Sequence, residues 1–325
     1  MSTTSDKSLW SFLVLTCVIS WPLWIASGVL SRGDLMLYDF RWLVGQVGVF
    51  GPSLSALIVS GNIGKELHQN SLRILPVLFL PLIVLGTLIA VASPNKVIEF
   101  PVLPSVLVVL VAAAIILFFS PFNRHLLNPA TGEVQEKPGA KWIFLSIVLI
   151  PGLFLLGWLL VNFQETGWQI SAFKGNFGSF GWIVLVCFAH NFLLGGSLGE
   201  ELGWRGFLLP ELLKRTGPLI ASLILGVVWA LWHLPADLSA GFFLRGPGAV
   251  LVRIIWTLPI AILFTWFYLK TNGNLLVALF LHTSLNILSD LGFSRYEYSL
   301  LFFFILTAVL AFVVSVSSPV FRKLF

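Results

Sequence analysis

Apolar runs of about 20 residues follow one another along almost the whole chain, and they constrain its fold more than any other feature. A run of this length crosses the hydrocarbon core of a bilayer as one α-helix. The runs are continuously apolar and do not alternate, which favours helices over a transmembrane β-barrel. With 58% hydrophobic and only 10% charged residues, the chain is too apolar for a soluble domain. The sequence therefore predicts an all-α, polytopic transmembrane bundle of roughly eight to ten spans.

The apolar runs and the basic residues together predict a topology. The first run is about 22 residues long, which exceeds the apolar region of a signal peptide, so we interpret it as a retained span. The segment 199–213 either continues the span before it or forms a separate interfacial helix. Most loop lysines and arginines fall on one side if both termini are cytoplasmic, as the positive-inside rule requires. The predicted spans are 9–30, 42–60, 74–93, 100–120, 142–162, 180–198, 218–239, 249–269, 274–292 and 298–320.

Ionisable residues within the apolar runs are concentrated between residues 180 and 292. Such groups are costly at membrane depth and usually face a cavity, find partners and carry function. We therefore divide this single membrane domain into an N-terminal scaffold at 1–179, a working core at 180–292 that forms a polar cavity, and a C-terminal span and tail at 293–325. The net charge of +5 is attributed to topology and gives no indication of nucleic-acid binding.

Two adjacent glutamates, Glu200 and Glu201, are the most unusual feature of this core. On a helix Glu201 and Arg205 share a face and can form an ion pair, whereas Glu200 is rotated by about 100° and points elsewhere. This spacing predicts that Arg205 orients Glu201, and that Glu200 faces the cavity as a general base. Nearby glycines, Gly199, Gly203 and Gly206, allow close helix packing. A charged helix end held by Arg205 is the alternative interpretation.

Two later apolar runs carry the patterns Trp229-x-x-x-His233 and His282-x-x-x-Asn286. The second places two polar groups on one helix face, as a helix does when it offers two ligands to one ion or water. Each pattern also has a purely structural interpretation. His233 can be a hydrogen-bonded core histidine, Trp229 can belong to an interfacial aromatic belt, and His282 with Asn286 can join two helices. Asp237 could also pair with His233, four residues before it.

Taken together, the polar groups suit the activation of a water molecule inside a membrane. Glu200, His233 and His282 provide the donors of a zinc site with an open position. Asn286 is a poor zinc ligand and is better suited to donating a hydrogen bond to an oxyanion. The residues therefore permit both a zinc hydrolase and a metal-free, glutamate-driven hydrolase.

The order of these motifs resembles the CPBP family of intramembrane proteases, which includes the CAAX prenyl endopeptidases of the Rce1 type, the Abi proteins and bacteriocin-immunity proteins. The resemblance covers residues 180–292, and the amino-acid sequence around Glu200 is similar to that of bacterial members. It implies that Glu200 activates the hydrolytic water, with His233 positioning it. It also implies that His282 and Asn286 complete the water site and stabilise the oxyanion, with Glu201 and Arg205 in support. Trp229, a further supporting residue, departs from the family pattern, which often has phenylalanine there, and changes the shape of the cavity but not its chemistry.

The function expected from these features is that of an intramembrane endopeptidase. Its partners would be the lipid bilayer and membrane-anchored or prenylated peptide substrates, and its location a bacterial cytoplasmic membrane. A second hypothesis is a non-proteolytic immunity or adaptor protein that keeps the fold. A third is a proton-coupled transporter, which is disfavoured because the ionisable groups cluster without an internal repeat.

Overall fold

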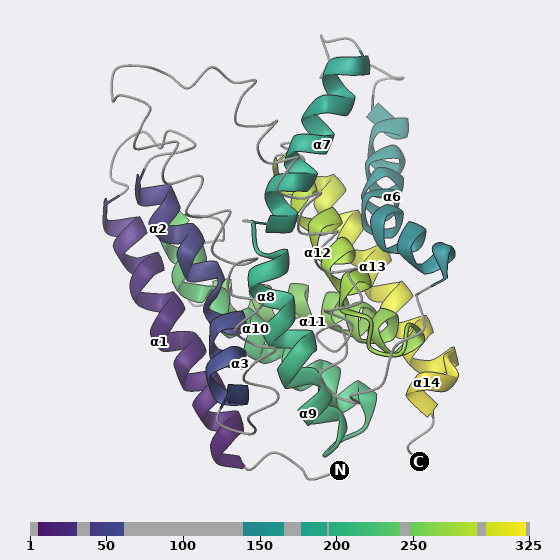
Figure 1. Ribbon diagram of the computed structural model, residues 1–325. Coiled ribbons are helices and arrows are strands. Elements are labelled where there is room, and N and C mark those ends of the chain that lie inside the picture. Colours follow the sequence, from purple (N-terminus) through teal and green to yellow (C-terminus); the bar gives the residue numbers. More distant parts are fainter. Residues whose placement is uncertain are drawn as a thin grey trace.

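The computed structural model describes residues 6–30, 40–61, 139–165, 177–193, 195–240, 248–290 and 297–322. These residues are helical almost throughout, and no strand occurs among them (Figure 1). The predicted spans at 74–93 and 100–120 lie outside the described residues. The elements are α1 (Asp6–Leu30), α2 (Phe40–Val49), α3 (Gly51–Gly61), α6 (Ala140–Glu165), α7 (Phe177–Leu193), α8 (Ser197–Gly203), the π-helical turn η2 (Trp204–Leu208), α9 (Leu209–Leu213), α10 (Pro218–Ala240), α11 (Gly248–Lys270), α12 (Leu275–Asp290), α13 (Glu297–Ser317) and α14 (Pro319–Arg322).

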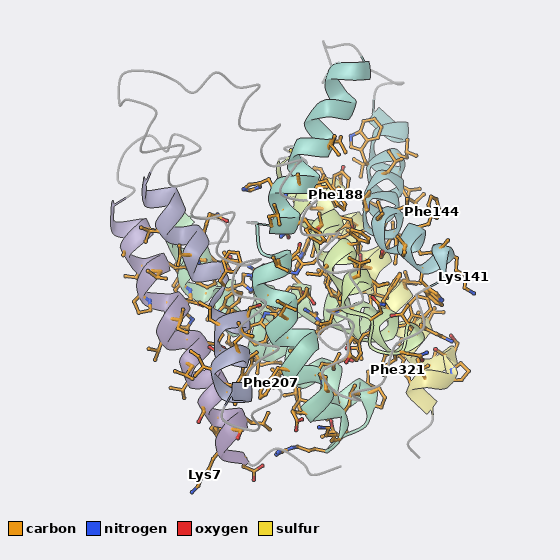
Figure 2. The ribbon with its side chains drawn as sticks, in the orientation of Figure 1. Lys7, Lys141, Phe144, Phe188, Phe207 and Phe321 are labelled. Atoms are coloured by element: carbon orange, nitrogen blue, oxygen red, sulfur yellow. The ribbon has the colours of Figure 1, made fainter. Side chains whose placement is uncertain are left out.

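Five of the described helices, α1, α6, α10, α11 and α13, are long and apolar enough to cross a membrane. Their outer faces are apolar too, since Phe144 on α6 is 64% exposed and Phe312 on α13 is 66% exposed. Figure 2 shows Phe144 on the outer side of α6. Large exposed apolar faces are unfavourable in water and favourable against lipid tails. The chain is therefore a multi-pass membrane bundle, as predicted.

Two predicted spans are wrong as single helices. The span at 42–60 is divided into α2 and α3 at Phe50, because Pro52 lacks the N–H that a continuous helix needs and its ring crowds the preceding turn. The span at 180–198 ends at Leu193, and α8 begins anew after Gly196, whose φ of +119° is incompatible with a right-handed helix. Residues 199–213 thus belong to a separate segment, which is buried in the bundle almost throughout.

The short helix α8 is packed inside the bundle and meets α3, α7 and α12 (Figure 1). The N-terminal helix α1 packs against α2, α3 and α10, while α10 pairs with α11. On the C-terminal side, α6 packs against α12 and α13. Residues of the predicted scaffold therefore contact the segment that carries the two glutamates.

The close approach of α3 to α8 depends on two glycines, as their spacing predicts. A Cβ atom at Gly199 would lie 2.8 Å from the carbonyl oxygen of Val49, and one at Gly203 would lie 2.5 Å from backbone atoms of Pro52. The hydroxyl of Ser53 also donates to the carbonyl of Leu198 at 3.0 Å. Since backbone atoms cannot move aside as a flexible side chain can, these contacts fix the depth of α8 in the bundle.

Gly203→Ala is expected to destabilise the protein by about 1–3 kcal/mol, because the new methyl group would collide with the backbone of Pro52 and force the two helices apart. The measurement is thermal unfolding of the purified variant in detergent. Gly152→Ala is the matched control, since a Cβ there meets no atom within 4 Å. Equal melting temperatures for both variants would contradict the proposed role of the α3–α8 contact.

Candidate active site

Glu201 and Arg205 form the ion pair that their spacing predicts. Arg205 NH1 lies 2.8 Å from Glu201 Oε1, and both side chains are 0% exposed. The guanidinium also packs against two aromatic rings, 4.6 Å from the centre of the Trp229 ring and 4.3 Å from that of Phe264. A planar, weakly hydrated cation packed against aromatic rings loses less on burial than an ammonium would.

The π-helical turn η2 follows the two glutamates directly. Leu209 N–H bonds to the carbonyl of Trp204, five residues earlier. Pro210 then provides no N–H and its ring crowds the carbonyl of Gly206, so a wider turn relieves the contact. Such turns are rare and often lie at functional sites. Here the turn contains Trp204 and Arg205, which contact Glu200 and Glu201 respectively.

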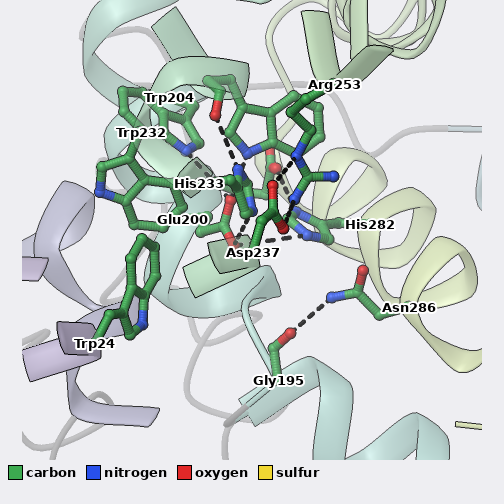
Figure 3. A network of polar contacts seen from close by, with 12 residues as sticks. Trp24, Gly195, Glu200, Trp204, Trp232, His233, Asp237, Arg253, His282 and Asn286 are labelled. Carbon is green, nitrogen blue, oxygen red and sulfur yellow. Dashed lines mark hydrogen bonds and ion pairs between the residues drawn. The ribbon is translucent and has the colours of Figure 1, made fainter. Parts of the chain in front are cut away.

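Glu200 points toward the two histidines (Figure 3), and its carboxylate does not take part in the Glu201–Arg205 ion pair. Its Oε2 atom accepts hydrogen bonds from Trp229 Nε1 at 2.6 Å and from Trp204 Nε1 at 3.3 Å. Its Oε1 atom lies 3.8 Å from His233 Nε2 and 3.9 Å from His282 Nε2. One oxygen is therefore anchored, and the other faces two imidazole nitrogens beyond direct hydrogen-bonding distance.

Both imidazoles are held through Nδ1, which directs Nε2 toward Glu200. His233 Nδ1 lies 2.8 Å from the carbonyl oxygen of Trp229, and His282 Nδ1 lies 2.6 Å from Glu201 Oε1. Because a carbonyl oxygen only accepts, Nδ1 of His233 carries the proton and its Nε2 is a free acceptor in the neutral ring. Glu201 is thus bound by both Arg205 and His282, so it links the ion pair to the site.

Asn286 lies one helical turn after His282, but its amide does not contact the glutamates. Asn286 Nδ2 donates to the carbonyl of Gly195 at 2.6 Å, in the turn between α7 and α8. This bond uses one of its two N–H groups and leaves the second for another acceptor. Asn286 thus joins α12 to the turn that precedes Glu200.

The predicted pairing of Asp237 with His233 is wrong. Asp237 pairs with Arg253 of α11, with Arg253 Nε 2.8 Å from Oδ2 and NH2 2.9 Å from Oδ1. The i,i+4 spacing correctly indicated that Asp237 forms an ion pair or hydrogen bond, but it gave the wrong partner. It could not identify a partner on another helix, since no local rule relates Asp237 to Arg253.

Several aromatic residues of the site were missed from the sequence. Trp24 of α1 lies 4.5 Å from Trp232 and 6.1 Å from His233 between ring centres (Figure 3). Trp21 Nε1 donates to the carbonyl of Trp232 at 3.0 Å. The i,i+4 spacing of Glu200 and Trp204 could have indicated their bond. No sequence signal relates α1 to α10.

The donor types of Glu200, His233 and His282 suit zinc, and their spacing is somewhat wider than that of zinc ligands. Two ligands of one tetrahedral zinc stand about 3.4 Å apart, less than the 3.8 and 3.9 Å between Glu200 Oε1 and the two Nε2 atoms. Within the described part of the chain, no three His, Cys, Asp or Glu side chains form a group that could hold a metal ion. We therefore derive no chemical step through a metal.

A water molecule fits these distances. The distances of 3.8 and 3.9 Å between Glu200 Oε1 and the Nε2 atoms of His233 and His282 are each short enough for one water oxygen to bridge. The anchored carboxylate can take a proton from that water, and the imidazoles can orient it. The arrangement thus provides what hydrolysis of a carbonyl compound needs.

Comparison with known proteins gives two matches. Residues 10–288 match the family described as type II CAAX prenyl endopeptidase Rce1-like. The chain is also similar to CAAX prenyl protease 2 of Methanococcus maripaludis, with 30% identity over 181 residues. That alignment covers 52% of this chain and 59% of the relative, so the chain spans less than two thirds of the relative's length.

Proposed function

The chain belongs to the Rce1-like family of type II CAAX prenyl endopeptidases, and we propose that it is an intramembrane endopeptidase acting on prenylated, membrane-anchored proteins. This is the family that the three sequence motifs resemble. The observation that carries the proposal is the position of Glu200 Oε1, opposite the Nε2 atoms of His233 and His282. It is supported by the burial of Glu200 and His282 and the partial burial of His233 in an apolar bundle, where a lipid-anchored substrate would reach them.

In the proposed reaction Glu200 removes a proton from a water held by the two histidines. The hydroxide attacks the scissile carbonyl carbon, and the free N–H of Asn286 donates to the oxygen that becomes negative. When the C–N bond breaks, the proton taken up by Glu200 is transferred to the leaving amine. The products are a new carboxylate and a free amine. Glu201 keeps His282 in the required tautomer through its bond to Nδ1.

The assay that tests this function compares two peptides. One carries a prenylated cysteine three residues before its C-terminus, and its twin lacks the lipid. We expect the purified protein to release the terminal tripeptide from the prenylated peptide only, as detected by mass spectrometry. If neither peptide is cleaved while the protein remains folded, the proposal is wrong and a non-proteolytic role takes its place. Repeating the assay with a zinc chelator tests whether a metal is needed.

We further propose that the bundle lies in a bacterial cytoplasmic membrane with both termini on the cytoplasmic side. Helix α1 begins and α14 ends at the same end of the bundle (Figure 1). Asp6 at the start of α1 forms an ion pair with Arg215, which follows α9. Loop lysines and arginines are more frequent on the cytoplasmic side of membrane proteins. Because Arg215 lies at the end of the bundle where α1 begins, we assign this end to the cytoplasmic side. Protease accessibility of tagged termini in inside-out vesicles tests the assignment.

A further inference from the structure

Two consecutive glycines form the turn between α7 and α8, immediately before the glutamates. Gly196 has φ of +119°, a conformation that L side chains rarely adopt. Its carbonyl accepts the N–H of Glu200 at 2.8 Å, so the turn sets the start of the helix that carries the proposed base. Neither glycine belongs to the three motifs that indicate the site.

The missing side chain of Gly196 faces the proposed water site. A Cβ atom there would lie 2.8 Å from Glu200 Oε1, 3.3 Å from Asn286 Nδ2 and 3.5 Å from His282 Nε2. These three polar atoms come from two helices, and they converge on one face of one α-carbon. A methyl group on that face would occupy space that the three atoms share.

Gly195 contributes through its backbone. Its carbonyl oxygen accepts Asn286 Nδ2 at 2.6 Å, which fixes the amide beside Gly196. A side chain at Gly195 is excluded as well, because its Cβ would lie 2.4 Å from Asn191 Oδ1 and 2.8 Å from Asn191 Cα. In this turn, Gly195 therefore holds the amide of Asn286, and Gly196 leaves open space beside it.

We infer that Gly196 is a positioning residue whose bare α-carbon keeps open the space for the hydrolytic water beside Glu200 Oε1 and His282 Nε2, next to the amide of Asn286. The inference rests on the proposed function for its catalytic meaning. Its geometric content, that an added methyl group meets the Glu200 carboxylate, does not depend on that function. The two parts can therefore be tested separately.

Kinetics of Gly196→Ala test the catalytic part. We expect kcat on the prenylated peptide to fall by about 100-fold or more, the effect of removing acid–base catalysis, with KM changed by less than about threefold, because the methyl group displaces water and not the peptide. Gly273→Ala is the matched control, since Gly273 also has a positive φ, of +81°, in the turn before α12. It should share the backbone strain and keep kcat.

Near-normal kcat in Gly196→Ala would overturn the inference even though the wild-type protein cleaves the peptide. An equal loss of kcat in Gly273→Ala would also overturn it, because strain alone would then explain the effect. Inactivity of the wild-type protein, in contrast, would be a failure of the proposed function.

Melting temperatures test the geometric part without any activity. Gly196→Ala is made in the wild-type protein and in the Glu200→Ala variant, which lacks the nearest clashing atom. We expect a large fall in melting temperature in the first background. In the second, the fall should be clearly smaller, since the strain remains and the clash is relieved. Equal falls in both backgrounds would show that the methyl group does not meet Glu200. If Gly196→Ala alone does not fold, recovery of a folded protein in the double variant is the result we expect, and an unfolded double variant would contradict the inferred contact with Glu200.

Discussion

Replacing Glu200 with glutamine is expected to reduce kcat for peptide cleavage by about 10²–10⁴-fold, the usual contribution of acid–base catalysis. Glutamine keeps an oxygen that can accept the N–H groups of Trp204 and Trp229, so the packing of α8 is preserved. It cannot take a proton from water at neutral pH. The loss should therefore appear in kcat, with little change in melting temperature.

Glu211→Gln is the matched control for this variant. Glu211 lies on α9 of the same helical segment, is also buried and pairs with Lys214. We expect its kcat to equal that of the wild-type protein, since it does not contact the histidines in the described structure. Retained cleavage in Glu200→Gln would contradict the assignment of Glu200 as the base.

Replacing Arg205 with alanine is expected to cost about 3–5 kcal/mol of stability, the largest effect on folding that we predict. The variant leaves the carboxylate of Glu201 buried without its cation, although His282 Nδ1 still contacts it. It also removes the packing of the guanidinium against Trp229 and Phe264. Thermal unfolding in detergent measures the effect.

Two further variants separate charge from shape at this position. Arg205→Lys keeps the positive charge but loses the packing of the planar guanidinium against the two rings, so we expect an intermediate loss. Combining Arg205→Met with Glu201→Gln removes both charges and should recover much of the stability that Arg205→Ala loses. An Arg205→Ala protein as stable as the wild type would mean that the ion pair contributes nothing to the fold.

The fold class could be predicted because it depends on a property that each segment has alone. A continuously apolar run such as 218–239 can only be a buried or lipid-facing helix, and α10 follows it closely. Breaks inside apolar runs were harder to predict. Phe50 and Gly196 interrupt two predicted spans because of backbone geometry at Pro52 and in the turn before α8, and apolar composition does not report such geometry.

The candidate site shows the same division between local and distant contacts. The pairing of Glu201 with Arg205 follows from helical spacing, and so does the separate direction of Glu200. The contacts of Asp237 with Arg253 and of Trp24 with His233 join different helices, which spacing cannot relate. The roles of these residues in catalysis remain predictions.

The central claim is that Glu200 activates a water molecule and does not itself attack the peptide. A single-turnover cleavage of the prenylated peptide in water labelled with oxygen-18 tests this most directly. We predict one labelled oxygen in the new carboxylate from the first turnover. A first-turnover product without label would mean that its oxygen came from the enzyme, as from a glutamyl anhydride. That result would contradict the account.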